Sequence, residues 1–181
     1  MPDGSDHTHH NTGTAPPEVA GETLPSCGDF DLRIGQDGTW YYRGSPIGRQ
    51  AVVKLFATVL HRRPDGYWLI TPAERGRIMV DDAPFVAVEA EAAGAGRDQV
   101  VAFRTNLDHW VAAGPDHRLA VRPPPGGGEP RPYIEVRNGL EAKLARPVYY
   151  RLVDLAVEEP TADGPRLGIW SRGVFFPLGE A

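Results

Sequence analysis

Aromatic and arginine residues occur together in two parts of this 181-residue chain. In the first part they follow a predicted strand and precede a predicted helix; these residues are Trp40, Tyr41, Tyr42, Arg43 and Arg49. In the second part they occupy comparable positions; these residues are Arg131, Tyr133, Arg137, Arg146, Tyr149 and Tyr150. Aromatic faces stack on flat rings, and guanidinium forks bind phosphates or carboxylates through paired hydrogen bonds. We therefore predict a cleft between two lobes that binds a small anionic ligand, such as a nucleotide.

A third polar segment, Arg104-Thr105-Asn106, ends another predicted strand and is expected to join this cleft. The predicted ligand-binding set is Trp40, Tyr42, Arg43, Arg49, Arg104, Asn106, Arg131, Tyr133, Arg137, Arg146 and Tyr149. The alternative is that the aromatic residues form the core between the lobes and that the arginines pair with the many carboxylates. Both interpretations place the set where the lobes meet.

The sequence lacks the common catalytic motifs, namely the Gly-x-Ser-x-Gly elbow, the Gly-x-x-x-x-Gly-Lys-Ser/Thr phosphate loop, His-Glu-x-x-His and Cys-x-x-Cys. Asp29 and Asp31 share one face of a predicted strand, where two carboxylates can hold a divalent metal for hydrolysis. A solvent-facing strand is the simpler interpretation of the same pair. The sequence therefore favours a non-enzymatic protein with no catalytic residues, no cofactor and no metal site, and a hydrolase is an alternative.

The charge balance and hydropathy exclude other kinds of partner. The formal net charge is −5, and no basic stripe is present, so we expect no binding to a nucleic-acid polymer. No apolar run approaches the roughly 18 residues that a membrane-spanning helix needs. The first residues do not form a secretory signal, and Cys27 is the only cysteine, so we expect a cytoplasmic protein.

Turn residues and apolar periodicity predict the elements of the chain. Asp37-Gly38 and Asn138-Gly139 are strong hairpin signals. Strands are predicted at 30–34, 39–43, 67–71, 77–80, 84–91, 99–105, 119–122, 133–137, 140–145, 167–170 and 174–178. Helices are predicted at 46–61, with Ser45 as the N-cap, and at 147–159, and a short helical turn is predicted at 106–114. Residues 1–22 are rich in Gly, Thr, Pro, Asp and His and are expected to be a disordered tail.

The two halves repeat the order strand, turn, strand, helix, hairpin. A gapless alignment of the helices pairs Arg49 with Arg146 and Leu55 with Leu152, and each helix is followed by a strand that carries Trp68 or Trp170. Two copies are too few for a solenoid, so they predict a duplicated lobe packed face to face. The predicted fold class is α+β, with an N-terminal lobe at 23–82 and a C-terminal lobe at 83–181.

Several segments resemble the bacterial domain-of-unknown-function family numbered 1285. The longest are Asp37-Gly-Thr-Trp-Tyr-Tyr-Arg-Gly-Ser-Pro-Ile-Gly-Arg, Asp82-Ala-Pro-Phe-Val-Ala-Val-Glu and Trp170-Ser-Arg-Gly-Val-Phe-Phe-Pro-Leu-Gly. The resemblance implies a tandem duplication, a C-terminal lobe similar to a pleckstrin-homology fold, and a signalling role with a nucleotide-like ligand between the lobes. It implies no catalytic residues. A protein–protein interaction module, with a partner strand added to a sheet edge, is the alternative function.

Overall fold

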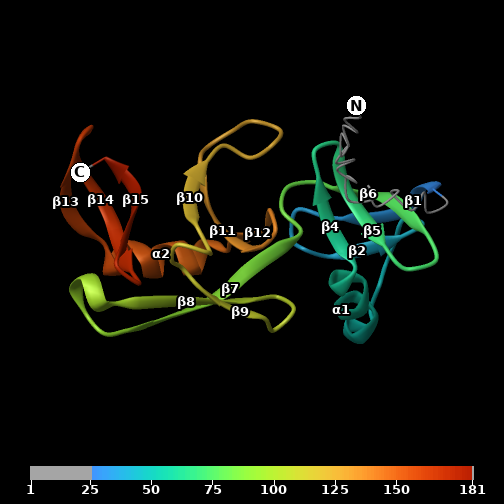
Figure 1. The fold of residues 1–181 in the computed structure, drawn as a ribbon, viewed down its shortest axis with the longest axis horizontal. Helices are drawn as coiled ribbons and strands as arrows, with labels where there is room; N and C mark the ends of the chain where they lie inside the picture. The colour runs from blue at the N-terminus through green and yellow to red at the C-terminus, as the bar shows by residue number, and fades with distance from the viewer. Residues whose placement is uncertain (1–25, 181) are drawn as a thin grey trace, which may run out of the picture.

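The computed structural model describes residues 26–180, and the tail predicted at 1–22 lies outside the described residues. Figure 1 shows two sheet-rich lobes, each with one α-helix. We call residues 26–82 the N-terminal lobe and residues 83–180 the C-terminal lobe. Neither α-helix of the described residues is long and apolar enough to cross a membrane.

The N-terminal lobe is a six-stranded sheet covered by one helix (Figure 1). Its strand order is β3-β2-β1-β6-β5-β4, and β1 lies parallel to β6. Its elements are β1 (Ser26–Ile34), β2 (Trp40–Tyr42), β3 (Ser45–Pro46), α1 (Gln50–Thr58), β4 (Leu60–Arg63), β5 (Gly66–Ile70) and β6 (Arg75–Val80). The Asp37-Gly38 turn joins β1 to β2, as predicted, because Gly38 adopts the positive φ of +83° that this turn requires.

The helix predicted at 46–61 is shorter than expected at both ends. Ser45 does not cap it; Ser45 and Pro46 instead form β3, and the Ile47 amide donates to the Trp40 carbonyl at 2.8 Å. Helix α1 begins after Arg49, which has no side-chain cap hydrogen bond. At the other end, the residues predicted to continue the helix form β4 (Leu60–Arg63) instead. Their backbone groups find hydrogen-bond partners in β5, across the turn at 64–66.

The C-terminal lobe contains a six-stranded sheet and a three-stranded sheet. The larger sheet has the order β10-β11-β12-β7-β8-β9, with β12 parallel to β7, and the smaller has the order β13-β14-β15. Its elements are β7 (Phe85–Ala93), η1 (Gly96–Asp98), β8 (Val100–Thr105), β9 (Trp110–Ala112), β10 (Leu119–Arg122), β11 (Arg131–Arg137), β12 (Leu140–Leu144), α2 (Arg146–Leu155), β13 (Val157–Thr161), β14 (Gly164–Ser171) and β15 (Val174–Glu180).

Two predictions for this lobe are wrong. Residues 106–114 do not form a helical turn; the chain turns at Thr105–His109 and returns as β9, because the Thr105 amide donates to the His109 carbonyl at 2.8 Å. Helix α2 ends at Leu155 rather than near Glu159, because Val157–Thr161 pairs with β14 as β13. In both cases hairpin pairing with the neighbouring strand overrides the local helical pattern.

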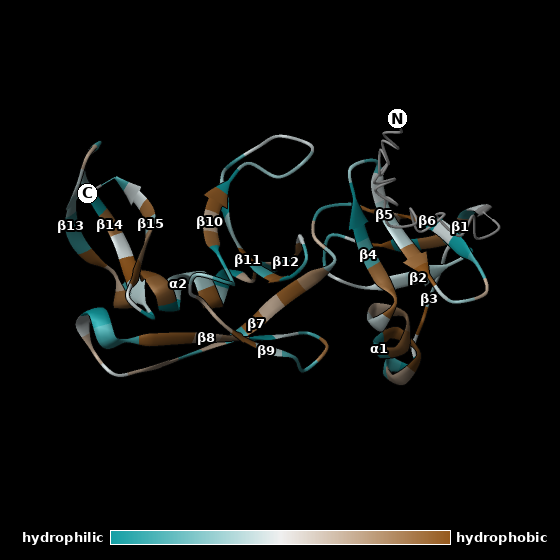
Figure 2. Cartoon of the chain, viewed as in Figure 1, coloured by the Kyte–Doolittle hydropathy of each residue, from teal (hydrophilic) through white to brown (hydrophobic). Residues whose placement is uncertain are grey.

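A buried serine connects the two sheets of the C-terminal lobe. Ser171, at the end of β14, is fully buried; its hydroxyl donates to the Ala113 carbonyl at 2.7 Å and accepts from the Val101 amide at 2.9 Å. Apolar residues follow β7, β8 and β10 in Figure 2. One continuous apolar core extends through both lobes, from Leu32 and Trp40 to Ile169 and Leu178.

The predicted repeat is visible in the order of elements. In each lobe a helix is followed by three antiparallel strands, and the middle strand carries the tryptophan. Trp68 donates to Asp65 and lies beside Arg77, and Trp170 donates to Glu159 and lies beside Arg97. Arg77 lies on β6, whereas Arg97 lies in η1, so the likeness of the two segments rests on their shared order of elements.

The gapless alignment of the two helices is wrong. It pairs Leu55, which is 63% exposed, with Leu152, which is fully buried. The buried residues of α1 are Val53 and Ala57, and those of α2 are Val148 and Leu152. An alignment shifted by two residues pairs Val53 with Val148 and Ala57 with Leu152, and so matches the buried residues of the two helices.

Candidate functional site

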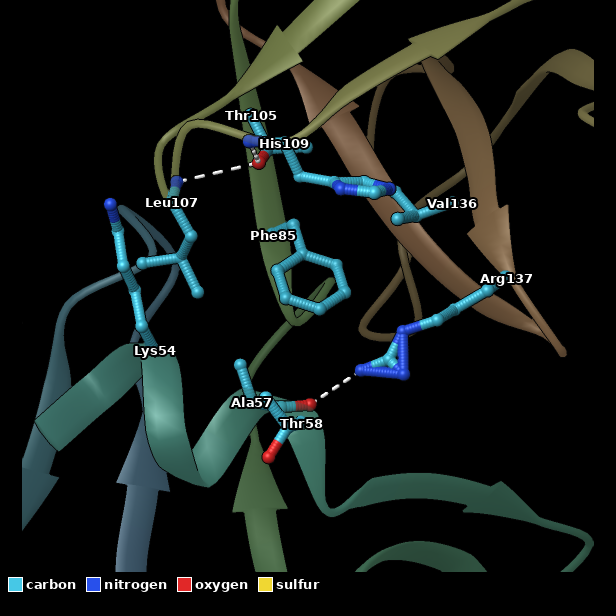
Figure 3. A pocket seen from close by; sticks show the side chains of 9 residues that line it. All are labelled: Lys54, Ala57, Thr58, Phe85, Thr105, Leu107, His109, Val136 and Arg137. Carbon is cyan, nitrogen blue, oxygen red and sulfur yellow. Dashed lines mark hydrogen bonds between the residues drawn. The ribbon is translucent and has the colours of Figure 1, made fainter. Parts of the chain in front are cut away.

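A cavity of about 360 Å³ lies between helix α1 of the N-terminal lobe and the C-terminal lobe (Figure 3). Its volume falls within the range of small-molecule sites. The residues that line it come from α1, β7, the end of β8 and the turn after it, and β11; they are Lys54, Ala57, Thr58, Phe85, Thr105, Leu107, His109, Val136 and Arg137. We call it the interlobe cavity.

Lys54 contributes one of the two permanent cations of the interlobe cavity. Its ammonium nitrogen lies 2.7 Å from a carboxylate oxygen of Asp108, which belongs to the turn after β8. Asp108 also accepts from Arg104, which in turn pairs with Glu89. The hydrogen bond from Lys54 is the main cause that lowers the pKa of Asp108 below its ordinary value, and Arg104 lowers it further. Asp108 is therefore ionised at neutral pH and holds Lys54 at the edge of the cavity.

Arg137 contributes the second cation and joins the two lobes. It is the last residue of β11, and its guanidinium donates to the carbonyl of Ala57 in the last turn of α1. The last four carbonyls of a helix have no partner within the helix, so this arginine satisfies one of them from the other lobe. Figure 3 shows the Arg137 guanidinium and the Lys54 ammonium on opposite sides of the Phe85 ring.

The floor of the interlobe cavity is apolar. Phe85 and Val136 are buried, and Leu107 is half-buried. Beside them, the buried Thr105 hydroxyl accepts hydrogen bonds from the amides of Leu107 and His109, which fixes the turn that carries both side chains. An exposed imidazole, that of His109, completes the lining. Two cations around an apolar floor can accommodate an anionic group attached to an apolar or ring-bearing body.

Asn106 holds the two lobes together next to the interlobe cavity. Its side-chain oxygen accepts from the Val86 amide at 3.0 Å, and its side-chain nitrogen donates to the Gly38 carbonyl at 3.4 Å. Its own carbonyl accepts from the Gln50 side chain at the start of α1, also at 3.4 Å. One asparagine therefore connects β7, the β1–β2 turn and helix α1.

The structure does not bring the eleven predicted ligand-binding residues into one cleft. Only Arg137 lines the interlobe cavity, and Arg104 and Asn106 lie behind it through their contacts with Asp108 and α1. Arg131, Arg146 and Tyr149 line a second cavity, which lies within the C-terminal lobe. The predicted single crevice, lined by arginines and rings from both repeats, is therefore wrong in its geometry.

The predicted residues of the N-terminal lobe lie away from the interlobe cavity. Trp40 is 1% exposed and stacks on Phe56 at a centroid distance of 6.2 Å, so it belongs to the core. Tyr42 is 48% exposed, and the Arg43 guanidinium lies 5.1 Å from its ring centroid. Arg49 is exposed at the start of α1. The alternative interpretation of the sequence, in which the aromatic residues belong to the core, is therefore correct for Trp40.

Tyr133 and Arg131 contact a buried carboxylate. The Tyr133 hydroxyl donates to Asp82 at 2.8 Å, and Arg131 and Lys143 lie 3.2 and 3.7 Å from the other oxygen of the same carboxylate. Burial is the first cause that raises the pKa of Tyr133 above its ordinary value, and the bond to Asp82 is the second. Tyr133 is therefore a neutral donor to Asp82, at the junction of the lobes.

Sequence reasoning missed most residues of the interlobe cavity, including Lys54, Phe85, Leu107, His109 and Val136. Phe85, Leu107 and Val136 resemble any core residue in the sequence. The rarity of lysine is the sequence signal that points to Lys54. The chain has 17 arginines but only two lysines, Lys54 and Lys143. Each of these two lysines lines one of the two cavities described above.

The carboxylates proposed for a hydrolase lie on the surface of the N-terminal lobe. The side chain of Asp29 is 83% exposed and lies 4.0 Å from Arg77, and Asp31 is also exposed. Between residues 28 and 180, no group of three or more His, Cys, Asp or Glu side chains is placed to hold a metal ion.

Comparison with known proteins identifies the family. A family model described as domain of unknown function (DUF1285), N-terminal domain, matches residues 17–83, and one described as protein of unknown function (DUF1285), C-terminal domain, matches residues 84–178. No curated protein matches the chain.

Two solved structures are similar to this fold. A DUF1285 family protein from Silicibacter pomeroyi DSS-3 is 47% identical, with a TM-score of 0.81, over 87% of this chain and 84% of that chain. A DUF1285 family protein from Shewanella baltica OS155 is 29% identical, with a TM-score of 0.54, over 68% of this chain and 91% of that chain. Because the two family models together span residues 17–178 and the first structure is so similar, this chain belongs to the DUF1285 family.

Proposed function

We propose that the interlobe cavity binds a small anionic ligand, such as a nucleotide, and that the protein acts as a non-enzymatic sensor in the cytoplasm. The observation that carries this proposal is the pair of cations, Lys54 and Arg137, on either side of an apolar floor (Figure 3). The cavity of about 360 Å³ admits a small molecule but not a polymer.

The charges of the cavity favour an anion. Asp108 compensates Lys54 on the outer side of the cavity, whereas Arg137 donates to a neutral carbonyl and keeps its full charge. A phosphate or carboxylate beside Arg137 would therefore meet an uncompensated guanidinium in a partly buried site, where charge-assisted hydrogen bonds are strong. The apolar part of the ligand would lie against Phe85 and Leu107.

A regulatory role follows from the origin of the lining. Lys54 and Ala57 belong to the N-terminal lobe, and Phe85 and Arg137 belong to the C-terminal lobe. A ligand that contacts both lobes binds most tightly to one arrangement of them, and so can shift a population between arrangements. We also propose that the fold is of the α+β class and that the C-terminal lobe is similar to a pleckstrin-homology fold.

Thermal shift against a library of nucleotides and small organic anions tests the proposal. A ligand present at 100 times its dissociation constant should add about 2.7 kcal/mol to the free energy of unfolding. We expect at least one anion to do so, and we expect Lys54→Met to weaken its binding by tenfold or more. Arg63→Met is the matched control, because it also removes one positive charge from an exposed position in the N-terminal lobe and lines neither cavity.

Three results would contradict this function. The first is a library without any stabilising anion. The second is equal weakening by Lys54→Met and Arg63→Met, which would show that net charge alone controls binding. The third is turnover of the ligand by the purified protein, which would make the protein an enzyme rather than a sensor.

A further inference from the structure

A second cavity, of about 510 Å³, lies entirely within the C-terminal lobe. It is formed by the start of β11 and the segment before it, the end of β12 and the first half of α2. Its lining combines basic and aromatic side chains with prolines; the residues are Glu129, Pro130, Arg131, Pro132, Lys143, Leu144, Ala145, Arg146, Tyr149 and Tyr150. It shares no residue with the interlobe cavity, and we call it the α2 cavity.

The α2 cavity has an excess of positive charge. Three of its residues are cations, and Glu129 is its only acidic lining residue. Arg131 and Lys143 both lie beside Asp82, a carboxylate whose side chain is only 2% exposed. The side chain of Arg146 forms no ion pair or hydrogen bond with any residue between 28 and 180, and it is exposed at the start of α2. One full guanidinium is therefore free to bind an anion.

Two tyrosines give this cavity an aromatic wall. The ring centroids of Tyr149 and Tyr150 are 6.4 Å apart, with an interplanar angle of 36°. Tyr149 is half-buried, whereas Tyr150 is 58% exposed. An aromatic side chain that is exposed beside a free guanidinium offers a surface on which a flat ring can stack while the anionic group of the ligand contacts the guanidinium.

We propose that the α2 cavity is a separate binding site for a phosphate monoester attached to a flat ring. Arg146 binds the phosphate in bidentate fashion, Arg131 and Lys143 add positive potential, and Tyr149 and Tyr150 contact the ring. Arg131 and Lys143 are held in place by Asp82 without being neutralised individually, because one carboxylate is shared by two cations and also accepts from Tyr133. The site is therefore arranged before the ligand arrives.

The rarity of lysine allows each cavity to be observed separately. Reductive methylation with ¹³C-formaldehyde labels Lys54, Lys143 and the α-amino group and keeps their charge, and Lys54→Arg and Lys143→Arg assign the two lysine signals. Phenyl phosphate is the probe, with inorganic phosphate and phenol as its two halves. We expect phenyl phosphate to move the Lys143 signal saturably and to leave the Lys54 signal in place. Amide signals of residues 143–146 and 148–150 in ¹H–¹⁵N spectra give a second measure.

Arg146→Ala and Arg151→Ala form a matched pair of variants. Both remove an exposed arginine from α2, but only Arg146 lines the cavity. We expect Arg146→Ala to weaken binding of phenyl phosphate at least fivefold, and Arg151→Ala to change it less than twofold. The proposal is overturned by equal effects of the two variants, by a shift that does not saturate, or by a response of Lys54 alone. Equal affinity for inorganic phosphate would overturn the role of the tyrosines.

Discussion

The side-chain amide of Asn106 donates to the carbonyl of Gly38 at 3.4 Å, across the boundary between the lobes. A Cβ atom on Gly38 would lie 2.8 Å from the Asn106 amide nitrogen and 2.9 Å from a methyl group of Val86. The close approach of the β1–β2 turn to the C-terminal lobe therefore depends on a glycine. It also brings Gln50 and helix α1 next to the interlobe cavity, because Gln50 donates to the Asn106 carbonyl.

Replacing Gly38 with alanine should destabilise the protein by about 2–4 kcal/mol, because strain at a positive φ adds to the steric clash with Asn106 and Val86. Gly44→Ala is the control, since Gly44 has a similar φ of +78° but a Cβ atom added there would meet no atom within 4 Å. That control should cost only about 1–2 kcal/mol. Urea denaturation of both variants measures the difference, and equal losses would mean that the contact with Asn106 is unimportant.

Lys54→Met should raise the pKa of Asp108 towards its ordinary value, although Arg104 will still hold it somewhat low. Because the folded pKa is lowered, the ion pair stabilises the native state above the ordinary aspartate pKa. This stabilisation is lost as the pH falls through the folded pKa. Titration of the ¹³C-labelled Asp108 carboxyl group measures the pKa directly. Lys143→Met serves as the control, and an unchanged Asp108 titration in Lys54→Met would disprove the interaction in solution.

Tyr133→Phe should remove an alkaline loss of stability. Because the folded pKa of Tyr133 is raised, its contribution is fully present below the ordinary tyrosine pKa of about 10 and is lost as the pH rises further. At pH 7 the variant should cost about 1–2 kcal/mol, since buried Asp82 loses a hydrogen bond. Urea denaturation from pH 7 to 11 tests this, with exposed Tyr42→Phe as the control. A wild-type protein that is as stable at pH 11 as at pH 8 would refute it.

Trp40→Ala should destabilise the protein by about 3–5 kcal/mol, because it empties a fully buried position in the core. Trp110→Ala, at a position that is 41% exposed, should cost less than about 1 kcal/mol. Trp40→Phe should be milder than Trp40→Ala, since among the described residues the Trp40 ring nitrogen has no hydrogen-bond partner to lose. Thermal and urea denaturation give these values. If Trp40→Ala is folded and stable but loses ligand binding, our assignment of Trp40 to the core is wrong.

Local chemistry accounts for the parts of the fold that the sequence predicts. The Asp37-Gly38 and Asn138-Gly139 hairpins form where they are expected, because Gly38, Asn138 and Gly139 adopt positive φ angles that few other residues tolerate. The existence of both helices and of most strands follows from apolar periodicity, which acts over a few residues. The ends of α1 and α2 do not, because β4 and β13 form only through pairing with strands that follow them.

The sequence by itself determined the hairpins, the two helices, the order of elements and the absence of common catalytic motifs. Only the tertiary structure decided which cations share a cavity. Lys54 and Arg137 belong to different lobes, and the packing of α1 against β11 brings them together. Likewise, the run of aromatic and basic residues at 40–43 has the same composition whether it lines a cleft or fills a core. Burial of Trp40 against Phe56 is a property of the assembled sheet and helix, which no local pattern encodes.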